Sequence, residues 1–166
     1  LDTLAMRRAP MEAAIERNTW FHIAHNSNQQ YIYCLMRMLE PVLEHVDNGF
    51  TPMPSAYINE YNQVLQRVDI LLKNSFMMMK TGVYNEYHPT MEIADALKGE
   101  LSTLRKQHID RIQKEESLNL TTSQIYLNLL QETQELLSIM RHQLRATKRF
   151  TQKTKTTAHG KDEEED

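Results

Sequence analysis

Hydrophobic residues recur at steps of three and four along four stretches of the chain, a spacing that gathers apolar side chains on one face of an α-helix. The first stretch, residues 10–47, opens at Pro10, which fits the first turn of a helix because its missing N–H needs no partner there. Pro41 should bend or interrupt the last turns of this helix. The stripe predicted for it is Ala13, Trp20, Ala24, Ser27, Tyr31, Leu35, Met38, Val42 and Val46.

The same spacing predicts three further helices. The second covers residues 54–82, with Gly82 as a left-handed cap. The third begins at Pro89 or the residue after it, and the fourth is capped by Thr121 or Thr122. The predicted stripe of the second helix is Tyr57, Tyr61, Val64, Val68, Leu71, Leu72, Ser75 and Met79. The stripe of the third is Ile93, Leu97, Leu101, Leu104, His108 and Ile112. The stripe of the fourth is Tyr126, Leu129, Leu130, Thr133, Leu137, Met140, Leu144 and Thr147.

Short connections between these helices make consecutive helices antiparallel neighbours. We therefore predict an all-α fold, in which residues 1–150 form one elongated up-down antiparallel four-helix bundle. Gly99 in the third helix would allow another helix to approach closely. Residues 151–166, "TQKTKTTAHGKDEEED", lose the periodicity and are predicted to be a disordered charged tail. The predicted interior contains Trp20, Tyr31, Met38, Leu65, Leu72, Leu101, Leu104, Leu130, Leu137 and Met140.

Composition narrows the setting of this bundle. The single cysteine, Cys34, forms no internal disulfide, which indicates a reducing, cytosolic compartment. No apolar run approaches the roughly 18 to 20 residues that cross a bilayer. The chain opens on Leu1 in the middle of a pattern, as a piece of a longer polypeptide would. Its net charge of -3 offers no general field for nucleic acid, and no nucleic-acid partner is expected.

The segment "HVDNGFTP", His45 to Pro52, has residues that suit a metal site, a phosphate site or the end of a helix. Asn48 and Gly49 supply the left-handed pair that closes a helix, and Phe50 can fold back onto the last turn. His108 should face the same interior, but two histidines without converging carboxylates do not make a metal site. We therefore expect an architectural role for His45, no bound metal and no cofactor. The acidic pairs Glu92 with Asp95 and Glu132 with Glu135 are expected on solvated helix faces.

Residues suited to catalysis are not brought together by the predicted helices. Cys34 has no base beside it, and no glycine-rich turn follows a strand to bind a phosphate. The chain is therefore expected not to be an enzyme.

Three blocks carry a resemblance to a known family: "EHVDNGFTPM" at 44–53, "ELSTLRKQHIDRIQKEES" at 100–117 and "YLNLLQETQELLSIMRHQLRATKRF" at 126–150. Together they resemble the PhoU-like cytoplasmic domain fused behind the membrane part of Pit-type inorganic phosphate transporters in some bacteria. The resemblance implies an all-α PhoU-like bundle with a regulatory or docking role in phosphate uptake. It implies a location on the cytoplasmic side of the inner membrane, with transmembrane segments of the same longer chain as partners.

The chain departs from the family at its metal sites. PhoU proteins that hold multinuclear metal clusters carry Glu/Asp-x-x-x-Asp pairs on helix faces. In the helical body here, no aspartate has an acidic residue four positions before it. The resemblance therefore implies no cluster.

Two other readings belong to different classes of protein. A histidine phosphotransfer domain needs an exposed histidine in mid-helix and a basic residue one turn later, which His142 and Arg145 in "HQLRATK" supply. A purely structural dimerisation bundle would use the "FMMMK" run, in which Phe76 and Met79 are expected near the core and Met77 and Met78 outside it, giving a homodimer.

Basic residues crowd the end of the fourth helix. This candidate docking surface would meet the anionic membrane surface or acidic loops of a partner. The acidic "DEEED" that follows would compete for the same cations as a weak brake. The residues of the candidate surface are Arg145, Lys148, Arg149, Lys153 and Lys155.

Overall fold

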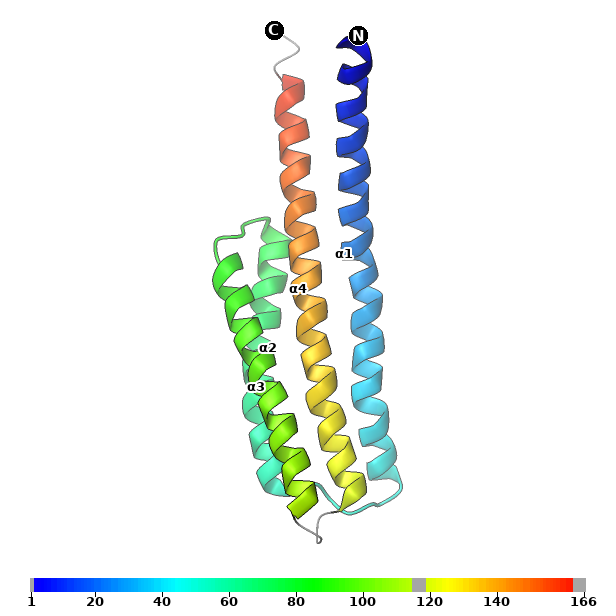
Figure 1. The fold of residues 1–166 in the computed structure, drawn as a ribbon, viewed down its shortest axis with the longest axis vertical. Helices are drawn as coiled ribbons and strands as arrows, with labels where there is room; N and C mark the ends of the chain where they lie inside the picture. The colour runs from blue at the N-terminus through cyan, green and yellow to red at the C-terminus, as the bar shows by residue number, and fades with distance from the viewer. Residues whose placement is uncertain (1, 115–118, 163–166) are drawn as a thin grey trace.

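The computed structural model describes residues 2–114 and 119–162, and the side chains of 7–114 and 119–152. Four helices run alternately up and down: α1 (Asp2–Asp47), α2 (Ser55–Thr81), α3 (Tyr87–Lys114) and α4 (Leu120–Asp162). Figure 1 shows α1 and α4 side by side and extending beyond the shorter α2–α3 pair. The predicted all-α, up-down antiparallel four-helix bundle is confirmed.

Three helices are longer than the sequence predicted. α1 begins at Asp2, so Pro10 lies inside it and not in its first turn. α3 begins at Tyr87, which still leaves Pro89 in the first turn, where backbone N–H groups lack helical partners. α4 continues to Asp162 and does not end near residue 150, because nothing from 151 to 159 breaks a helix. The predicted tail is thus corrected for residues 151–162, and 163–166 lie outside the described residues.

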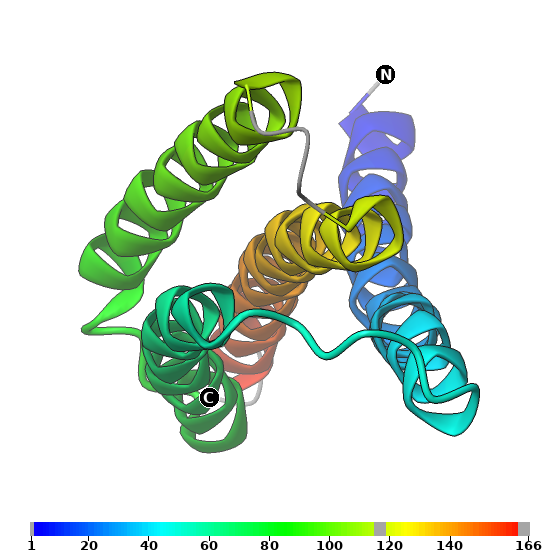
Figure 2. The same ribbon diagram turned by 90° about the horizontal axis from the view of Figure 1, so that it is seen from below.

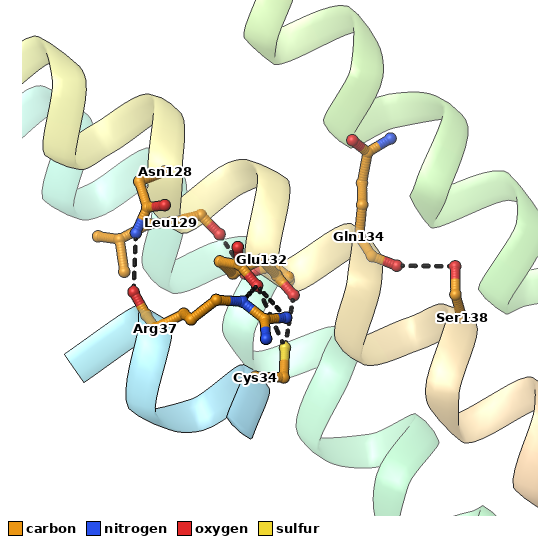
Figure 3. Close-up of polar contacts among 8 residues, drawn as sticks. Cys34, Arg37, Asn128, Leu129, Glu132, Gln134 and Ser138 are labelled. Carbon is orange, nitrogen blue, oxygen red and sulfur yellow. Dashed lines mark hydrogen bonds and ion pairs between the residues drawn. The ribbon is translucent and has the colours of Figure 1, made fainter. Parts of the chain in front are cut away.

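Pro41 does not interrupt α1, which continues to Asp47. A proline leaves the carbonyl four residues earlier without its helical donor, here the carbonyl of Arg37. The side-chain amide of Asn128 in α4 donates to that oxygen at 2.9 Å (Figure 3). A neighbouring helix thus supplies the hydrogen bond that proline removes.

α4 is the central helix of the bundle. Within the described residues, the backbone of α1 approaches only that of α4, while α2 and α3 pack on each other and on α4. Figure 2 shows α4 between α1 on one side and the α2–α3 pair on the other. α4 therefore buries two stripes where one was predicted. The second stripe contains Ile125, Glu132, Leu136, Ile139, Gln143 and Ala146.

The predicted interior is confirmed at its centre and corrected at its edges. Met38, Leu101, Leu130, Leu137 and Met140 are buried. Four others pack against the core while partly buried, and Trp20 is half-buried outside it. The residues that pack against the core are Tyr31, Leu65, Leu72 and Leu104.

The helical phase was wrong at several stripe positions. In α1, Leu35 and Val46 are exposed and Cys34 is fully buried in place of Leu35. In α3, Ile93 is exposed and its neighbour Ala94 is buried. Residues 31–39 are apolar on every side of the helix, so their spacing fits more than one phase.

Glycine ends two helices as predicted. Gly49 and Gly82 have φ of 62° and 69°, in the left-handed region that a Cβ disfavours. The N–H of Gly82 donates to the carbonyl of Met78 at 2.9 Å. Gly99 was expected to admit a close helix, but nothing lies within 4 Å of where its Cβ would be.

Candidate functional site

The described part of the candidate docking surface lies where α4 passes the α2–α3 connection. Thr151 of α4 lies next to this connection, because its methyl group is the nearest atom, at 3.9 Å, to the position that a Cβ on Gly82 would occupy. Arg145 and Arg149 are exposed, and Lys148 is half-buried. Lys153 and Lys155 belong to α4, but their side chains lie outside the described residues.

The basic side chains of this surface point to different helices. The ammonium of Lys148 lies 3.9 Å from the ring centroid of Tyr87 in α3. The guanidinium of Arg149 lies 4.8 Å from the ring centroid of Trp20 in α1. Successive residues of a helix are separated by about 100°. The positive charges therefore spread around the end of the bundle and do not converge on one pocket, which suits an extended anionic surface better than a small anion.

His142 is exposed in the middle of α4, with exposed Arg145 one turn later. Both features match the phosphotransfer reading. Ala146, the small residue one turn after His142, is fully buried against the bundle. It therefore gives no room on the surface beside His142.

The run at the end of α2 has a different orientation from the one predicted. Phe76 and Met77 are 59% and 53% exposed, whereas Met78 is 5% exposed and belongs to a core cluster with Met91 and Leu144. The expectation that Phe76 lies near the core and Met78 outside is thus corrected. Burying Met78 continues the spacing of Leu71 and Ser75, since these three residues lie at steps of four and three.

Glu132 is a buried carboxylate that the sequence reading placed on a solvated face. Its side chain is 10% exposed and accepts from the Arg37 guanidinium at 2.8 and 2.9 Å (Figure 3). Its partner Glu135 in the predicted acidic pair is exposed. The signal that was missed is the second stripe of α4, which Glu132 occupies at a three- and four-residue spacing.

Cys34 lies beside this ion pair, and its thiol has low reactivity. Its thiol donates to the carbonyl of Glu132 at 3.2 Å and lies 3.7 Å from the carboxylate (Figure 3). Burial, and then the negative charge of Glu132, raises the pKa of the Cys34 thiol to about 11. The thiol is therefore protonated at neutral pH and is a poor nucleophile.

His108 is fully buried between two tyrosines. Its ring centroid lies 4.8 Å from that of Tyr57 and 4.7 Å from that of Tyr126. Neither ring nitrogen has a hydrogen-bond partner among the described residues. Loss of solvation, and then the nearby charge of Arg111, lowers the pKa of His108, which keeps the ring neutral. The Glu60 carboxylate accepts from the Tyr126 hydroxyl at 2.6 Å and from the Arg111 guanidinium at 3.4 Å, and not from His108.

His45 has an architectural contact at the end of α1, as the sequence predicted. Its Nε2 lies 2.7 Å from the carbonyl of Thr51, and its ring lies 5.5 Å from that of Phe50. Thr122 at the start of α4 donates to the same carbonyl at 3.2 Å. His45 and Thr122 therefore hold the α1–α2 connection against α4. An open pocket of about 310 Å³ lies beside them, lined by Pro41, Glu44, His45, Phe50, Thr121, Gln124, Ile125 and Asn128.

Within the described residues, no three histidine, cysteine or acidic side chains converge as a metal site would require. The described helices also include none long and apolar enough to span a bilayer. Searches of family models, curated proteins and solved structures found no match to this chain.

Proposed function

We propose that this chain is a non-catalytic regulatory and interaction domain of an inorganic phosphate transporter, acting on the cytoplasmic side of the inner membrane. Its partners would be transmembrane segments of the same longer chain and the anionic lipid around them. The resemblance of three blocks, 44–53, 100–117 and 126–150, to PhoU-like domains of Pit-type transporters supports this proposal.

The structural observation that carries the proposal is the spread of positive charge where α4 leaves the bundle. Arg145 and Arg149 are exposed there, and Lys148 lies between them in sequence. Each basic residue near an anionic bilayer surface contributes about 1 kcal/mol to binding, and salt screens that attraction. A bundle whose end carries such residues suits docking beside a membrane-embedded partner.

Vesicle binding tests the membrane part of the proposal. The chain should sediment with phosphatidylcholine–phosphatidylglycerol vesicles at low salt, less so at high salt, and little after Arg145, Lys148 and Arg149 are all changed to Gln. The matched control changes exposed Lys73 on α2 and exposed Lys106 and Lys114 on α3 to Gln. It removes the same number of positive charges from the chain, but away from the candidate docking surface. Deleting residues 161–166, which include the acidic run, should increase binding. No binding at low salt even after this deletion would contradict the proposal.

Phosphate uptake tests the transporter part. Cells expressing the membrane segments of a Pit-type transporter should take up labelled phosphate at a different rate when this chain is fused behind those segments. The triple Gln variant should abolish much of the difference. Equal uptake with and without the fused chain would refute a regulatory role.

A second candidate function is histidine phosphotransfer, which the exposure of His142 and Arg145 favours. Incubation with acetyl phosphate or an aspartyl-phosphate donor protein should then give an acid-labile phosphate on the chain. That phosphate should disappear in His142→Ala and persist in His88→Ala, a control at another exposed histidine. Absence of acid-labile phosphate in the unmodified chain would eliminate this function.

A further inference from the structure

α1 has a long apolar face that no other described helix covers. On the side away from α4, the residues Ile32, Met36, Leu39, Leu43 and Val46 are 57%, 47%, 56%, 57% and 68% exposed. They follow one another at steps of four, three, four and three. This alternation is the heptad spacing of the a and d positions in a coiled coil.

The heptad line continues toward the start of α1 and changes character on the way. Taking the same steps backward reaches Gln29, His25, His22 and Asn18, all exposed, and then two further apolar residues. These are Ile15 and Met11, 58% and 62% exposed. The face is therefore apolar at both ends with a polar block in the middle.

This line stays on the outer side of α1 because α1 already follows a heptad path against α4. The residues of α1 that face α4 follow one another at steps of four, three, four and seven, which is also a heptad spacing. All are buried or half-buried: Ser27, Tyr31, Cys34, Met38 and His45. Two faces with the same period keep a constant angle around the helix. The outer face is therefore exposed to solvent from Gln29 to Val46, whereas Met11, Ile15 and Asn18 at its start also line an open pocket beside Phe150 of α4.

We propose that this face pairs with the same face of a second copy, α1 against α1, in a parallel and in-register two-fold dimer. A two-fold interface uses the same surface on both copies. In register, the polar block meets a polar block and each apolar end meets an apolar end. A uniformly apolar partner helix would instead bury Asn18, His22, His25 and Gln29 without partners, at a cost in free energy.

Charge selects the parallel orientation. The carboxylates Glu12, Glu40 and Asp47 all lie at the e positions of this heptad, one residue after d. In a parallel pair, each e position faces the g position five residues earlier in the partner, so Glu12 faces the cation Arg7, and no carboxylate faces another. In an antiparallel pair, e positions face e positions, so carboxylates would meet carboxylates. After Arg7, the g positions are the uncharged residues Ala14, Phe21, Asn28, Leu35 and Val42.

The length of the face is sufficient for a stable dimer. From Met11 to Val46 it extends about 50 Å at the rise of an α-helix. A stable interface buries about 800 Å² and about 20 to 30 residues on each partner. The a, d, e and g positions over this span number about 20, at the lower end of that range.

Sedimentation velocity over a range of concentrations tests the pairing. The full chain should be dimeric, and Leu39→Glu with Leu43→Glu should make it monomeric with an unchanged helical circular dichroism spectrum, because both residues are exposed in one copy. The matched control is Ile70→Glu with Ile93→Glu, at residues 57% and 50% exposed on α2 and α3, which should remain dimeric. A monomer at high micromolar concentration, or a dimer that both double variants retain, would overturn the proposal.

Cross-linking tests the orientation. In the parallel pair, Leu39 faces Leu39 of the other copy, so Leu39→Cys should form a disulfide-linked dimer under a mild oxidant. The unchanged chain, whose single Cys34 is buried, should not. Cross-linking only between Leu39→Cys and His22→Cys chains, whose positions meet when the face from Met11 to Val46 pairs antiparallel, would show the antiparallel pair and contradict the proposed one. The dimer does not rest on the proposed function, and neither test involves phosphate, lipid or a transporter.

Discussion

α4 and α1 are the two long helices of this bundle, and they differ in how many sides are covered. α4 is buried along one stripe against α2 and α3 and along another against α1, so its exposed positions are few. Among the described residues, the backbone of α1 packs only against that of α4, and from Ile32 to Val46 α1 exposes apolar residues. The difference shows that apolar spacing alone does not determine which side of a helix is the interior. That depends on the number of neighbours, which the arrangement of the other helices determines.

Removing volume should separate the two kinds of face most strongly. Leu137 in α4 is fully buried, so Leu137→Ala should lower the free energy of unfolding by about 2 to 5 kcal/mol through the cavity it leaves. Ile70 is 57% exposed, and Ile70→Ala should change the free energy of unfolding by less than about 0.5 kcal/mol. Urea unfolding of both variants measures the contrast. A loss below about 1 kcal/mol for Leu137→Ala would mean that α4 is not the central helix.

The contact between α1 and α4 should depend on the buried ion pair. Arg37→Ala leaves the Glu132 carboxylate buried without its main partner, and we expect a loss of about 1 to 3 kcal/mol. The half-exposed position of Arg37 keeps this below the cost of breaking a fully buried pair. Adding Glu132→Gln to Arg37→Ala should recover part of the loss, because a neutral amide is less costly to bury. If Arg37→Ala and the double variant lost the same free energy of unfolding, the buried charge of Glu132 would not be the cause of the loss.

The interior on the other side of α4 should be sensitive to pH through His108. Its pKa is lowered in the folded chain, so below the ordinary histidine value of about 6.5 the unfolded chain binds the proton first. Stability from this residue is therefore complete above that pH and is lost as pH falls toward the folded pKa. His108→Phe keeps a ring between Tyr57 and Tyr126 without the titration.

The measurement compares the free energies of unfolding of the unchanged chain and His108→Phe at several pH values from 8 to 5. The difference should move in favour of the variant as pH falls. His88→Phe, at an exposed site, provides the control and should show a much smaller trend. A constant difference across this range would contradict the neutral, desolvated state of His108.

The sequence predicted the number, order and direction of the helices and one stripe of α4, because turn residues such as Gly49 and Gly82 and the apolar spacing act locally. It did not predict the second stripe of α4, because Glu132 and Gln143 interrupt its apolar character. Only the position of α1 shows that these polar residues are buried, since Arg37 and Asn28 are what they bind.

The sequence identified the basic residues of the candidate docking surface but not the directions in which their side chains point. Lys148 and Arg149 are neighbours in sequence, and their charges lie over rings on different helices, Tyr87 and Trp20. The sequence contains no local signal for those two contacts, because each depends on which helix passes that level of α4. The proposals for a phosphate transporter and for phosphotransfer stay predictions that the experiments above address.

The smallest expected effect concerns one hydrogen bond by which α4 compensates for proline in α1. Asn128→Ala removes the donor to the Arg37 carbonyl, and we expect a loss of about 0.5 to 1.5 kcal/mol. In a Pro41→Ala background, residue 41 regains a backbone N–H, which can donate to that carbonyl within the helix. Asn128→Ala should then cost less, giving a coupling between the two sites in a double-mutant cycle. Additive effects would mean that Asn128 contributes packing and not the missing hydrogen bond, and the tolerance of α1 for Pro41 would then have another source. A coupling of the expected sign would show that the covered side of α1 depends on α4 for its backbone hydrogen bonding as well as for its burial.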